Sequence, residues 1–190
     1  AVDRHVESGN GGNTAIIYEG DEPSNIQKLT FSELQALVSK YANTLKSQGV
    51  RKGDVVTIYM LMIPEVAIAM LACARIGAVH SVVFAGFSSG AIAERISSAG
   101  SKFVMTADFG MRGSKKIPLK KLVDDAIAGA KLESLVEKVF VLDRFGSFED
   151  KPLTGRDVDL QSLAESQRAV CPCEEMDSED PLFILYTSGS

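Results

Sequence analysis

Short apolar runs alternate with segments of helical periodicity along most of the chain. Apolar runs of about four to eight residues between turn residues are typical of strands, whereas apolar residues recurring every three or four positions indicate a helix face. We therefore expect strands at residues 14–18, 28–31, 55–60, 80–84, 102–106, 138–142 and 182–186. Helices are expected over residues 31–48, 64–76, 88–98 and 119–130.

Local signals fix several of these helix ends. Thr30 is followed three residues later by Glu33, which is the spacing of a capping box. Pro64 suits the first turn of a helix, where its missing N–H costs nothing. Gly49 and Gly77 stand where a helix is expected to end.

The order of the elements predicts the fold class. Strands alternate with helices from residue 55 to residue 142, which is the pattern of right-handed βαβ units in a parallel sheet. We expect an α/β fold with a mainly parallel sheet, helices on both faces and a short antiparallel hairpin near the N-terminus. The run 182–186 is apolar throughout, so we expect it to be a strand buried inside the sheet.

Composition and charge narrow the classes of function. The chain has 190 residues and 45% apolar residues, which is enough for one domain with a substantial core. Its net charge of −5 argues against nucleic acid and against an anionic membrane as partners. We see no signal peptide, and the longest apolar segment, at residues 66–76, is too short to span a bilayer.

Cysteine and histidine usage predicts neither disulfides nor metal sites. Cys73 lies in an apolar helical run and is expected in the core, and the pair Cys171 and Cys173 lacks two further ligands for zinc. A reducing, cytoplasmic compartment is the simplest interpretation. His80 is expected to be a packed imidazole, and His5 is expected in a frayed terminus.

Three loops follow predicted strands and contain candidate ligand-binding residues, because parallel sheets bind ligands at the carboxyl ends of their strands. They are residues 84–90, 108–116 and 187–190. The second contains Arg112, Lys115 and Lys116, and cations on a glycine-containing loop suit a phosphate. A solvated, mobile basic loop and an ordinary turn after residue 186 remain open alternatives. The motifs of P-loop and Rossmann domains are absent, and the residues suggest no nucleophile–histidine–carboxylate arrangement.

Five stretches resemble AMP-forming acetate–CoA ligases, the acetyl-CoA synthetase family of the adenylate-forming, AMP-binding superfamily. They are residues 14–21, 52–60, 70–81, 117–121 and 179–190, the last ending in Tyr-Thr-Ser-Gly-Ser. The resemblance runs from about Val2 to Ser190 and weakens between residues 131 and 176. It implies that residues 1–190 are a single, incomplete N-terminal AMP-binding domain without the family's C-terminal domain. The chain stops within a loop and does not begin with Met, so we expect it to be a piece of a longer protein.

The resemblance implies a two-step reaction with small-molecule substrates. Acetate attacks the α-phosphate of ATP to give acetyl-AMP and pyrophosphate, and CoA then takes the acetyl group and releases AMP. It implies that the ATP phosphates are bound by the loop that begins with Thr187, Ser188, Gly189 and Ser190. It also implies CoA contacts at Arg112, Gly113, Ser114 and Lys115 and at the turn Phe84, Ala85 and Gly86.

Two positions depart from the family's pattern. Lys115 replaces a second arginine, which turns a planar fork into a point charge, and Ala85 replaces a glycine. The resemblance places the catalytic residues and the Mg²⁺ ligands beyond Ser190, so we assign no catalytic residue and no metal ligand and expect the chain alone to be inactive. A propionyl- or other acyl-CoA synthetase and a non-catalytic CoA- or nucleotide-binding module remain alternatives, and the oligomeric state stays open.

Overall fold

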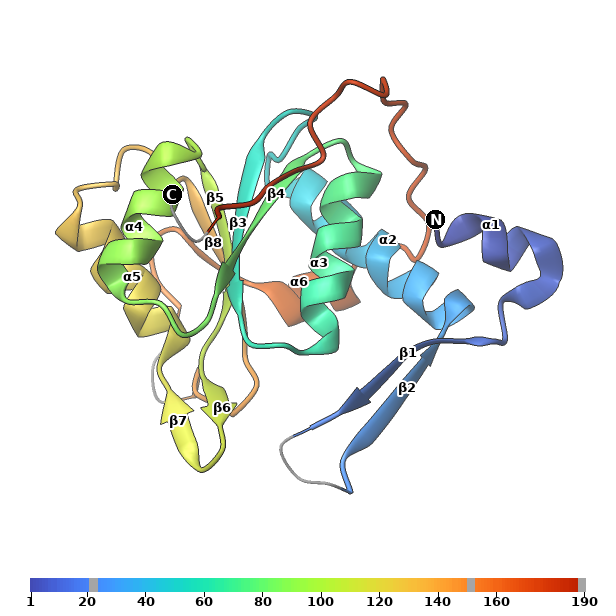
Figure 1. Cartoon of the computed structure of the whole chain (residues 1–190), viewed down its shortest axis with the longest axis horizontal. Helices are drawn as coiled ribbons and strands as arrows, with labels where there is room; N and C mark the ends of the chain where they lie inside the picture. Colours follow the sequence, from blue (N-terminus) through green and yellow to red (C-terminus); the bar gives the residue numbers. More distant parts are fainter. Residues whose placement is uncertain (21–23, 150–152, 188–190) are drawn as a thin grey trace.

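A computed structural model describes residues 1–20, 24–149 and 153–187. Its centre is a six-stranded parallel sheet with the order β10-β4-β3-β5-β8-β9 (Figure 1). The bounds of these strands are β3 (Val55–Met60), β4 (Val79–Phe84), β5 (Phe103–Ala107), β8 (Lys138–Leu142), β9 (Asp157–Asp159) and β10 (Phe183–Ile184). The expected α/β class and mainly parallel sheet are thus confirmed.

Helices cover both faces of this sheet, as expected. Figure 1 shows α2, α3 and α6 on one side, and α4 and α5 on the other. Their bounds are α2 (Phe31–Ser47), α3 (Pro64–Arg75), α4 (Ser89–Ser98), α5 (Leu119–Gly129) and α6 (Leu160–Glu165). Among the described residues, no helix combines the length and apolar character needed to cross a membrane.

The helix ends follow the local sequence signals. The Thr30 hydroxyl accepts a hydrogen bond from Glu33 N (3.2 Å), and a Glu33 carboxylate oxygen accepts one from Thr30 N (2.8 Å). These two bonds form the predicted capping box and satisfy two N–H groups at the start of α2. Pro64 is in the first turn of α3, and Gly77 adopts a φ of 70° just after that helix ends.

The core lies between the sheet and its two helical layers. Tyr59, Phe103 and Phe140, on three adjacent strands, are its largest fully buried side chains. Cys73 on α3 is buried as predicted, and burial raises the pKa of its thiol to about 12. His80 is also buried as predicted; it stacks on Phe183 at 5.6 Å, and burial lowers its pKa.

The N-terminus is ordered, so the expectation of frayed residues around His5 was wrong. A short helix, α1 (Asp3–His5), continues into a π-helical turn, η1 (Val6–Asn10), and Val2 is buried. His5 stacks on Phe31 with ring centroids 4.3 Å apart. Beyond it, β1 (Thr14–Glu19) and β2 (Ile26–Thr30) form the predicted antiparallel hairpin, which Figure 1 shows projecting from the body.

A long segment between α6 and β10 crosses the α2–α3 layer as a strap. Most of residues 167–179 are exposed, but Cys171 is buried. Arg75 Nη1 donates to the Cys171 carbonyl (2.6 Å), and Glu174 N donates to the Arg75 carbonyl (2.8 Å). Asn43 Nδ2 also donates to the carbonyl of Val170 (3.0 Å). The strap is therefore fastened to both helices beneath it.

The last strand differs from its prediction. The sequence predicted a buried inner strand at residues 182–186, but β10 covers Phe183–Ile184 alone and lies at the edge of the sheet. Leu182 and Phe183 are each 53% exposed and Leu185 is 70% exposed. An apolar run predicts burial only if other elements cover both of its faces, and none within the described residues covers the outer side of β10.

Candidate functional site

The carboxyl ends of the central parallel strands all lie at the same end of the sheet. The register pairs Met60 with Phe84 and Ala107 with Leu142, so neighbouring strands end at similar levels. α3 follows β3 on one face, whereas α4 follows β4 on the other (Figure 1). From β3 the chain adds β4 on one side, whereas from β5 it adds β8 and β9 on the other, so the strand order reverses between β3 and β5. This reversal is the topological switch point where α/β sheets bind ligands.

The turn after β4 lies at the same end of the sheet, next to β3. Phe87 N donates to the Phe84 carbonyl (3.1 Å), and the two rings meet edge to face at 6.0 Å. Phe84 is 57% exposed, whereas Ala85 is buried. A Cβ atom on Gly86 would lie 2.5 Å from Phe84 Cε1, so the ring can lie over the backbone only because residue 86 is glycine.

The basic segment after β5 is a hairpin rather than the loop that the sequence predicted. β6 (Gly110–Arg112) pairs antiparallel with β7 (Lys115–Ile117), and Arg112 is opposite Lys115. Gly113 in the turn has a φ of 58°, a left-handed conformation that favours glycine. Each of these strands has only three residues, so the alternation of apolar and polar residues is too short to be recognised in the sequence. The hairpin places Arg112, Gly113, Ser114 and Lys115 together at its tip.

The root of the hairpin is packed and hydrogen-bonded. A Cβ atom on Gly110 would overlap the Leu61 side chain in the loop after β3, so the hairpin backbone lies directly on that loop. Asp108 is buried, and its carboxylate accepts hydrogen bonds from the backbone N–H groups of Phe109 (2.6 Å), Arg144 (3.0 Å) and Phe145 (3.2 Å). Asp108 therefore joins the hairpin root to the loop after β8.

That loop has an acidic anchor of its own. Asp143 accepts hydrogen bonds from the backbone N–H groups of Ser147 (2.8 Å) and Phe148 (3.3 Å). Partial burial alone would raise the pKa of Asp143, but these bonds outweigh it and hold the pKa below its ordinary value. The charged carboxylate thus organises the backbone beneath the hairpin.

The three cations of the basic segment have different environments. Lys116 Nζ lies 4.0 Å from the centroid of the Phe109 ring and 4.8 Å from that of Phe145. It is therefore a cation–π anchor between the hairpin and the loop after β8, a role that the sequence did not reveal. Arg112 and Lys115 are exposed, and no carboxylate in the described ranges forms an ion pair with them.

A cavity of about 1020 Å³ lies beside the hairpin root, between α5 and residues 147–148 and 153–157. Carboxylates outnumber cations in its lining, which contains Asp108, Asp124, Glu133, Glu137 and Asp157 but only Lys120, Lys121 and Arg156. Lys120 Nζ is also paired there, 2.6 Å from an Asp124 oxygen and 3.1 Å from an Asp157 oxygen. The hairpin tip, by contrast, presents two exposed cations, Arg112 and Lys115, that form no ion pair within the described ranges. The tip is therefore a better place for an anionic ligand than the cavity.

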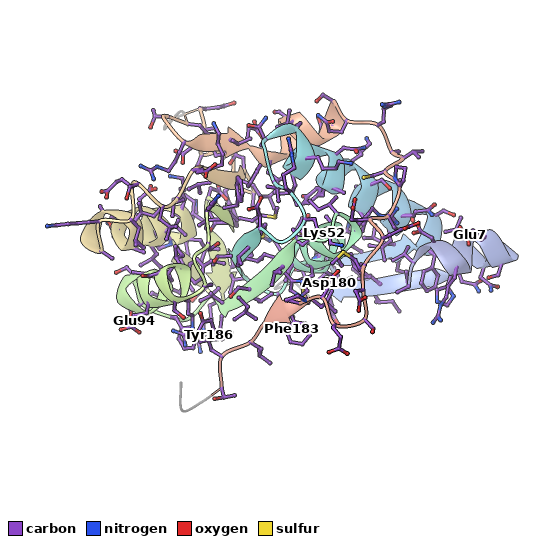
Figure 2. The ribbon with its side chains drawn as sticks, turned by 90° about the horizontal axis from the view of Figure 1, so that it is seen from above. Glu7, Lys52, Glu94, Asp180, Phe183 and Tyr186 are labelled. Atoms are coloured by element: carbon purple, nitrogen blue, oxygen red, sulfur yellow. The ribbon has the colours of Figure 1, made fainter. Side chains whose placement is uncertain are left out.

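The third candidate loop, residues 187–190, is described only at its first residue. Thr187 follows β10 and is exposed, whereas Ser188, Gly189 and Ser190 lie outside the described residues. Just before Thr187, the Tyr186 hydroxyl lies 2.8 Å from Ser98 Oγ and donates to the Arg95 carbonyl (3.3 Å). β10 therefore leads the chain from the sheet edge onto α4, as Figure 2 shows for Tyr186.

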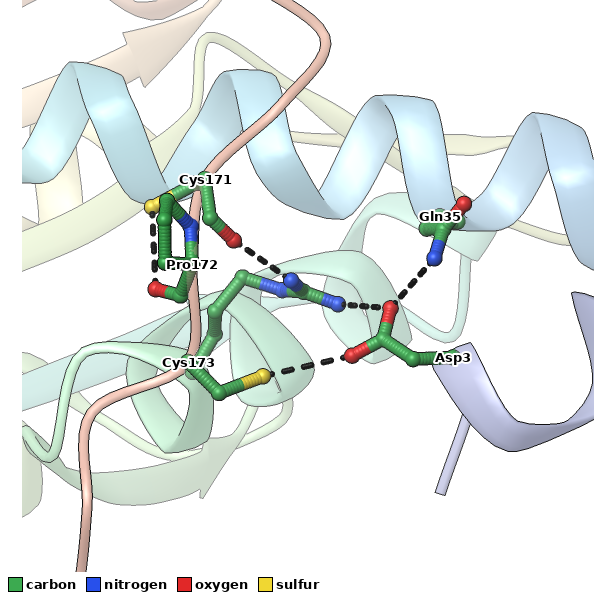
Figure 3. Close-up of polar contacts among 6 residues, drawn as sticks. Asp3, Gln35, Cys171, Pro172 and Cys173 are labelled. Carbon is green, nitrogen blue, oxygen red and sulfur yellow. Dashed lines mark hydrogen bonds and ion pairs between the residues drawn. The ribbon is translucent and has the colours of Figure 1, made fainter. Parts of the chain in front are cut away.

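No metal centre can be assembled from the described part of the chain, because it contains no group of three or more His, Cys, Asp or Glu side chains that could hold an ion. Cys171 and Cys173 instead belong to a polar cluster on the opposite side of the sheet from α4 (Figure 3). Cys173 Sγ donates to Asp3 Oδ2 (3.2 Å), and Cys171 is buried beside Arg75. In the structure, both cysteines contribute to the contacts between the strap and the rest of the protein.

The sequence is similar to known enzymes over its whole length. It is 56% identical over 189 residues to "Acetyl-coenzyme A synthetase" from Shewanella sp. (strain MR-4), 57% to that from Shewanella putrefaciens (strain CN-32 / ATCC BAA-453) and 55% to that from Shewanella frigidimarina (strain NCIMB 400). Each match covers 100% of this chain and 29% of the relative, so the chain spans less than a third of their length. The profile of the family described as AMP-binding enzyme matches residues 2–190. The chain therefore belongs to the AMP-binding enzyme family.

Proposed function

We propose that this chain is the incomplete N-terminal AMP-binding domain of an AMP-forming acetate–CoA ligase. The observation that carries the proposal is the 56% identity over 189 residues to a relative named acetyl-coenzyme A synthetase. The name of that relative favours acetate over propionate or a longer acyl acid. The chain also matches a family of enzymes, which argues against a binding module that catalyses no reaction.

The proposed reaction has two steps. A carboxylate oxygen of acetate attacks the α-phosphorus of ATP, and the bond to the β-phosphate oxygen breaks to release pyrophosphate. The thiol sulfur of CoA then attacks the acetyl carbonyl carbon, and AMP leaves as the thiol proton is lost. In this chain, Thr187, Ser188, Gly189 and Ser190 begin the loop that binds the ATP phosphates.

The basic hairpin is the proposed binding site for the phosphates of CoA. Arg112 and Lys115 face each other at the tip and have no carboxylate partner in the described part of the chain. The planar guanidinium of Arg112 can donate two parallel hydrogen bonds to a phosphate, whereas Lys115 supplies a point charge. Backbone N–H groups of Gly113 and Ser114 add neutral donors in the same turn.

The turn after β4 is the proposed neighbour of the CoA adenine. The exposed Phe84 ring supplies an apolar surface, and Gly86 allows that ring to lie close to the backbone of the turn. Ala85 points into the protein, because it is 2% exposed, so its methyl group does not obstruct a ligand on this turn. The replacement of the family's glycine by alanine is therefore compatible with the proposed contact.

The remaining chemistry is assigned to other parts of the full-length protein. Mg²⁺ would neutralise phosphate charge in the adenylation step, and we place its ligands and the catalytic residues outside this chain. The three cysteines are free thiols, which suits a reducing cytoplasm. The residues described above bind and orient substrates and perform no bond-breaking step.

A pyrophosphate-release assay tests the proposal. The full-length protein is expected to release pyrophosphate in the presence of ATP, Mg²⁺ and acetate, and to form acetyl-CoA once CoA is added. Residues 1–190 alone are expected to release none, because transition-state stabilisation needs groups they do not contain. Equal or greater activity of the full-length protein with propionate would contradict the choice of acetate, and acetate-dependent turnover by the isolated chain would contradict the assignment of catalysis to other parts.

A further inference from the structure

Arg95 connects two segments that are far apart in the sequence. Its guanidinium carbon lies 4.5 Å from the centroid of the Phe87 ring and 5.1 Å from that of the Tyr186 ring. Phe87 ends the turn after β4, and Tyr186 immediately precedes Thr187. Figure 2 shows Tyr186 beside α4, the helix that carries Arg95.

Both aromatic partners of Arg95 are held by further contacts. The Tyr59 hydroxyl, on the central strand β3, donates to the Phe87 carbonyl (3.1 Å). The Tyr186 hydroxyl donates to the Arg95 carbonyl (3.3 Å) and lies 2.8 Å from Ser98 Oγ. Arg95 is therefore the middle of a continuous set of contacts from the sheet, through the turn, to the chain before Thr187.

The charge of Arg95 is not used in an ion pair within the described residues. One guanidinium nitrogen, Nη1, donates to the Ala91 carbonyl (3.1 Å) in the same helix, which fixes the direction of the side chain. A planar guanidinium can stack on two rings at once, whereas an ammonium group presents only a point charge. A lysine at this position would keep the positive charge but could not stack on both rings. The arrangement therefore depends on arginine itself and not only on a positive charge.

We propose that Arg95 is a positioning residue that sets the CoA-proximal turn and the start of the ATP phosphate loop relative to each other. This inference rests on the function proposed above, since that function gives the two segments their ligands. Arg95 contacts neither substrate in the proposal and acts through Phe87 and Tyr186. Its loss is therefore expected to weaken both half-reactions, in contrast to loss of a residue at the hairpin tip.

Substitutions in the full-length protein test the proposal. Arg95→Met removes the charge and the planar group but keeps an apolar stem, and is expected to raise KM for ATP and for CoA by about 5- to 30-fold each. Arg95→Lys is expected to recover part of both losses. Glu94→Gln, at an exposed neighbouring position on α4, is the matched control and is expected to leave both values unchanged.

Hydrogen exchange separates failure of this inference from failure of the proposed function. Arg95→Met is expected to speed amide exchange in residues 84–88 and 183–187 while leaving α3 unchanged. That pattern supports positioning even if the wild-type protein shows no acetate-dependent pyrophosphate release, a result that would overturn the proposed function alone. Unchanged exchange in either segment overturns the inference. So does an increase in only one of the two KM values in an active enzyme.

Discussion

Asp3 and Arg75 form an ion pair that joins the first helix to α3, with Nη2 of Arg75 2.5 Å from Oδ1 of Asp3. The Arg75 side chain is 8% exposed and that of Asp3 is 27% exposed. Asp3 also accepts hydrogen bonds from Gln35 Nε2 (2.5 Å) and Cys173 Sγ (3.2 Å). One carboxylate therefore fastens the N-terminus to α2, α3 and the strap (Figure 3).

Replacing Asp3 by asparagine is expected to lower the free energy of unfolding by about 2 kcal/mol, because it leaves the charge of the buried Arg75 without its partner. Urea denaturation of the chain measures the change. Glu7→Gln, at an exposed position in the same N-terminal segment, is the control and should stay within about 0.5 kcal/mol of the wild type. Equal stability of the two variants would show that the ion pair contributes nothing.

The Asp3 carboxylate is also expected to make the free energy of unfolding depend on pH. Burial by itself would raise the pKa of Asp3, but hydrogen bonds from Gln35, Arg75 and Cys173 lower it from 3.8 to about 2. A lowered pKa means that the stabilisation is complete above about pH 4 and is lost as the pH falls through about 2. The difference in unfolding free energy between wild type and Asp3→Asn should therefore be constant from pH 5 to 7 and shrink below pH 4. A constant difference down to pH 2 would refute this assignment.

The backbone contact at the hairpin root is tested by Gly110→Ala. The added methyl group meets Leu61 and lies 3.2 Å from Leu119 Cδ1, so either the hairpin or the loop after β3 must move. We expect a loss of about 1–3 kcal/mol in thermal or urea unfolding. Gly129→Ala is the matched control, because a methyl group there meets nothing within 4 Å, and it should be neutral or slightly stabilising.

Lys116→Met is expected to loosen the hairpin without unfolding the protein. It removes the cation that contacts Phe109 and Phe145, a contribution of about 0.5–1 kcal/mol at an exposed site. Hydrogen exchange in residues 110–117 should become faster by roughly twofold to fivefold. Lys116→Arg keeps a cation over the rings and should retain most of the protection. Similar exchange rates in the Met and Arg variants would rule out a cation–π anchor.

Under the function proposed above, Arg112→Ala in the full-length protein is expected to raise KM for CoA by about 10- to 150-fold, because the proposed charge-assisted contact to a phosphate is lost. Lys115→Ala should cause a smaller increase. Formation of acetyl-AMP should be nearly unchanged in both variants, since that half-reaction does not use CoA. Lys121→Ala, an exposed cation on α5 that pairs with Asp125, is the control. An equal loss in adenylation would show that the hairpin has a different role.

The sequence predicted the features that depend on near neighbours. The capping box at Thr30 and the proline start of α3 are local arrangements, and the periods of the central strands and helices were long enough to identify. The strand–helix alternation predicted that the sheet is parallel, but it did not predict the order of the strands within it.

The features that the sequence did not predict depend on contacts from distant segments. Leu185 is exposed because nothing in the described residues packs on the outer side of β10. The apolar run itself carries no information about what will pack there. Likewise, Lys116 looks like Arg112 and Lys115 in the sequence, and only the folded positions of Phe109 and Phe145 separate it from them. Arg95 gave no motif, because its partners lie on other elements. A short strand and helix at residues 157–165 were missed for the same reason.

The strand order has a consequence for how the chain folds as it leaves the ribosome. β3 is the first strand of the sheet to be synthesised, β4 and β5 are added on either side of it, and β8, β9 and β10 each join an outer edge afterwards. Among the strands that the structure describes, no later one has to insert between two earlier ones. Growth of the sheet can therefore keep pace with translation from the N-terminal end, with each new strand adding to an edge that already exists.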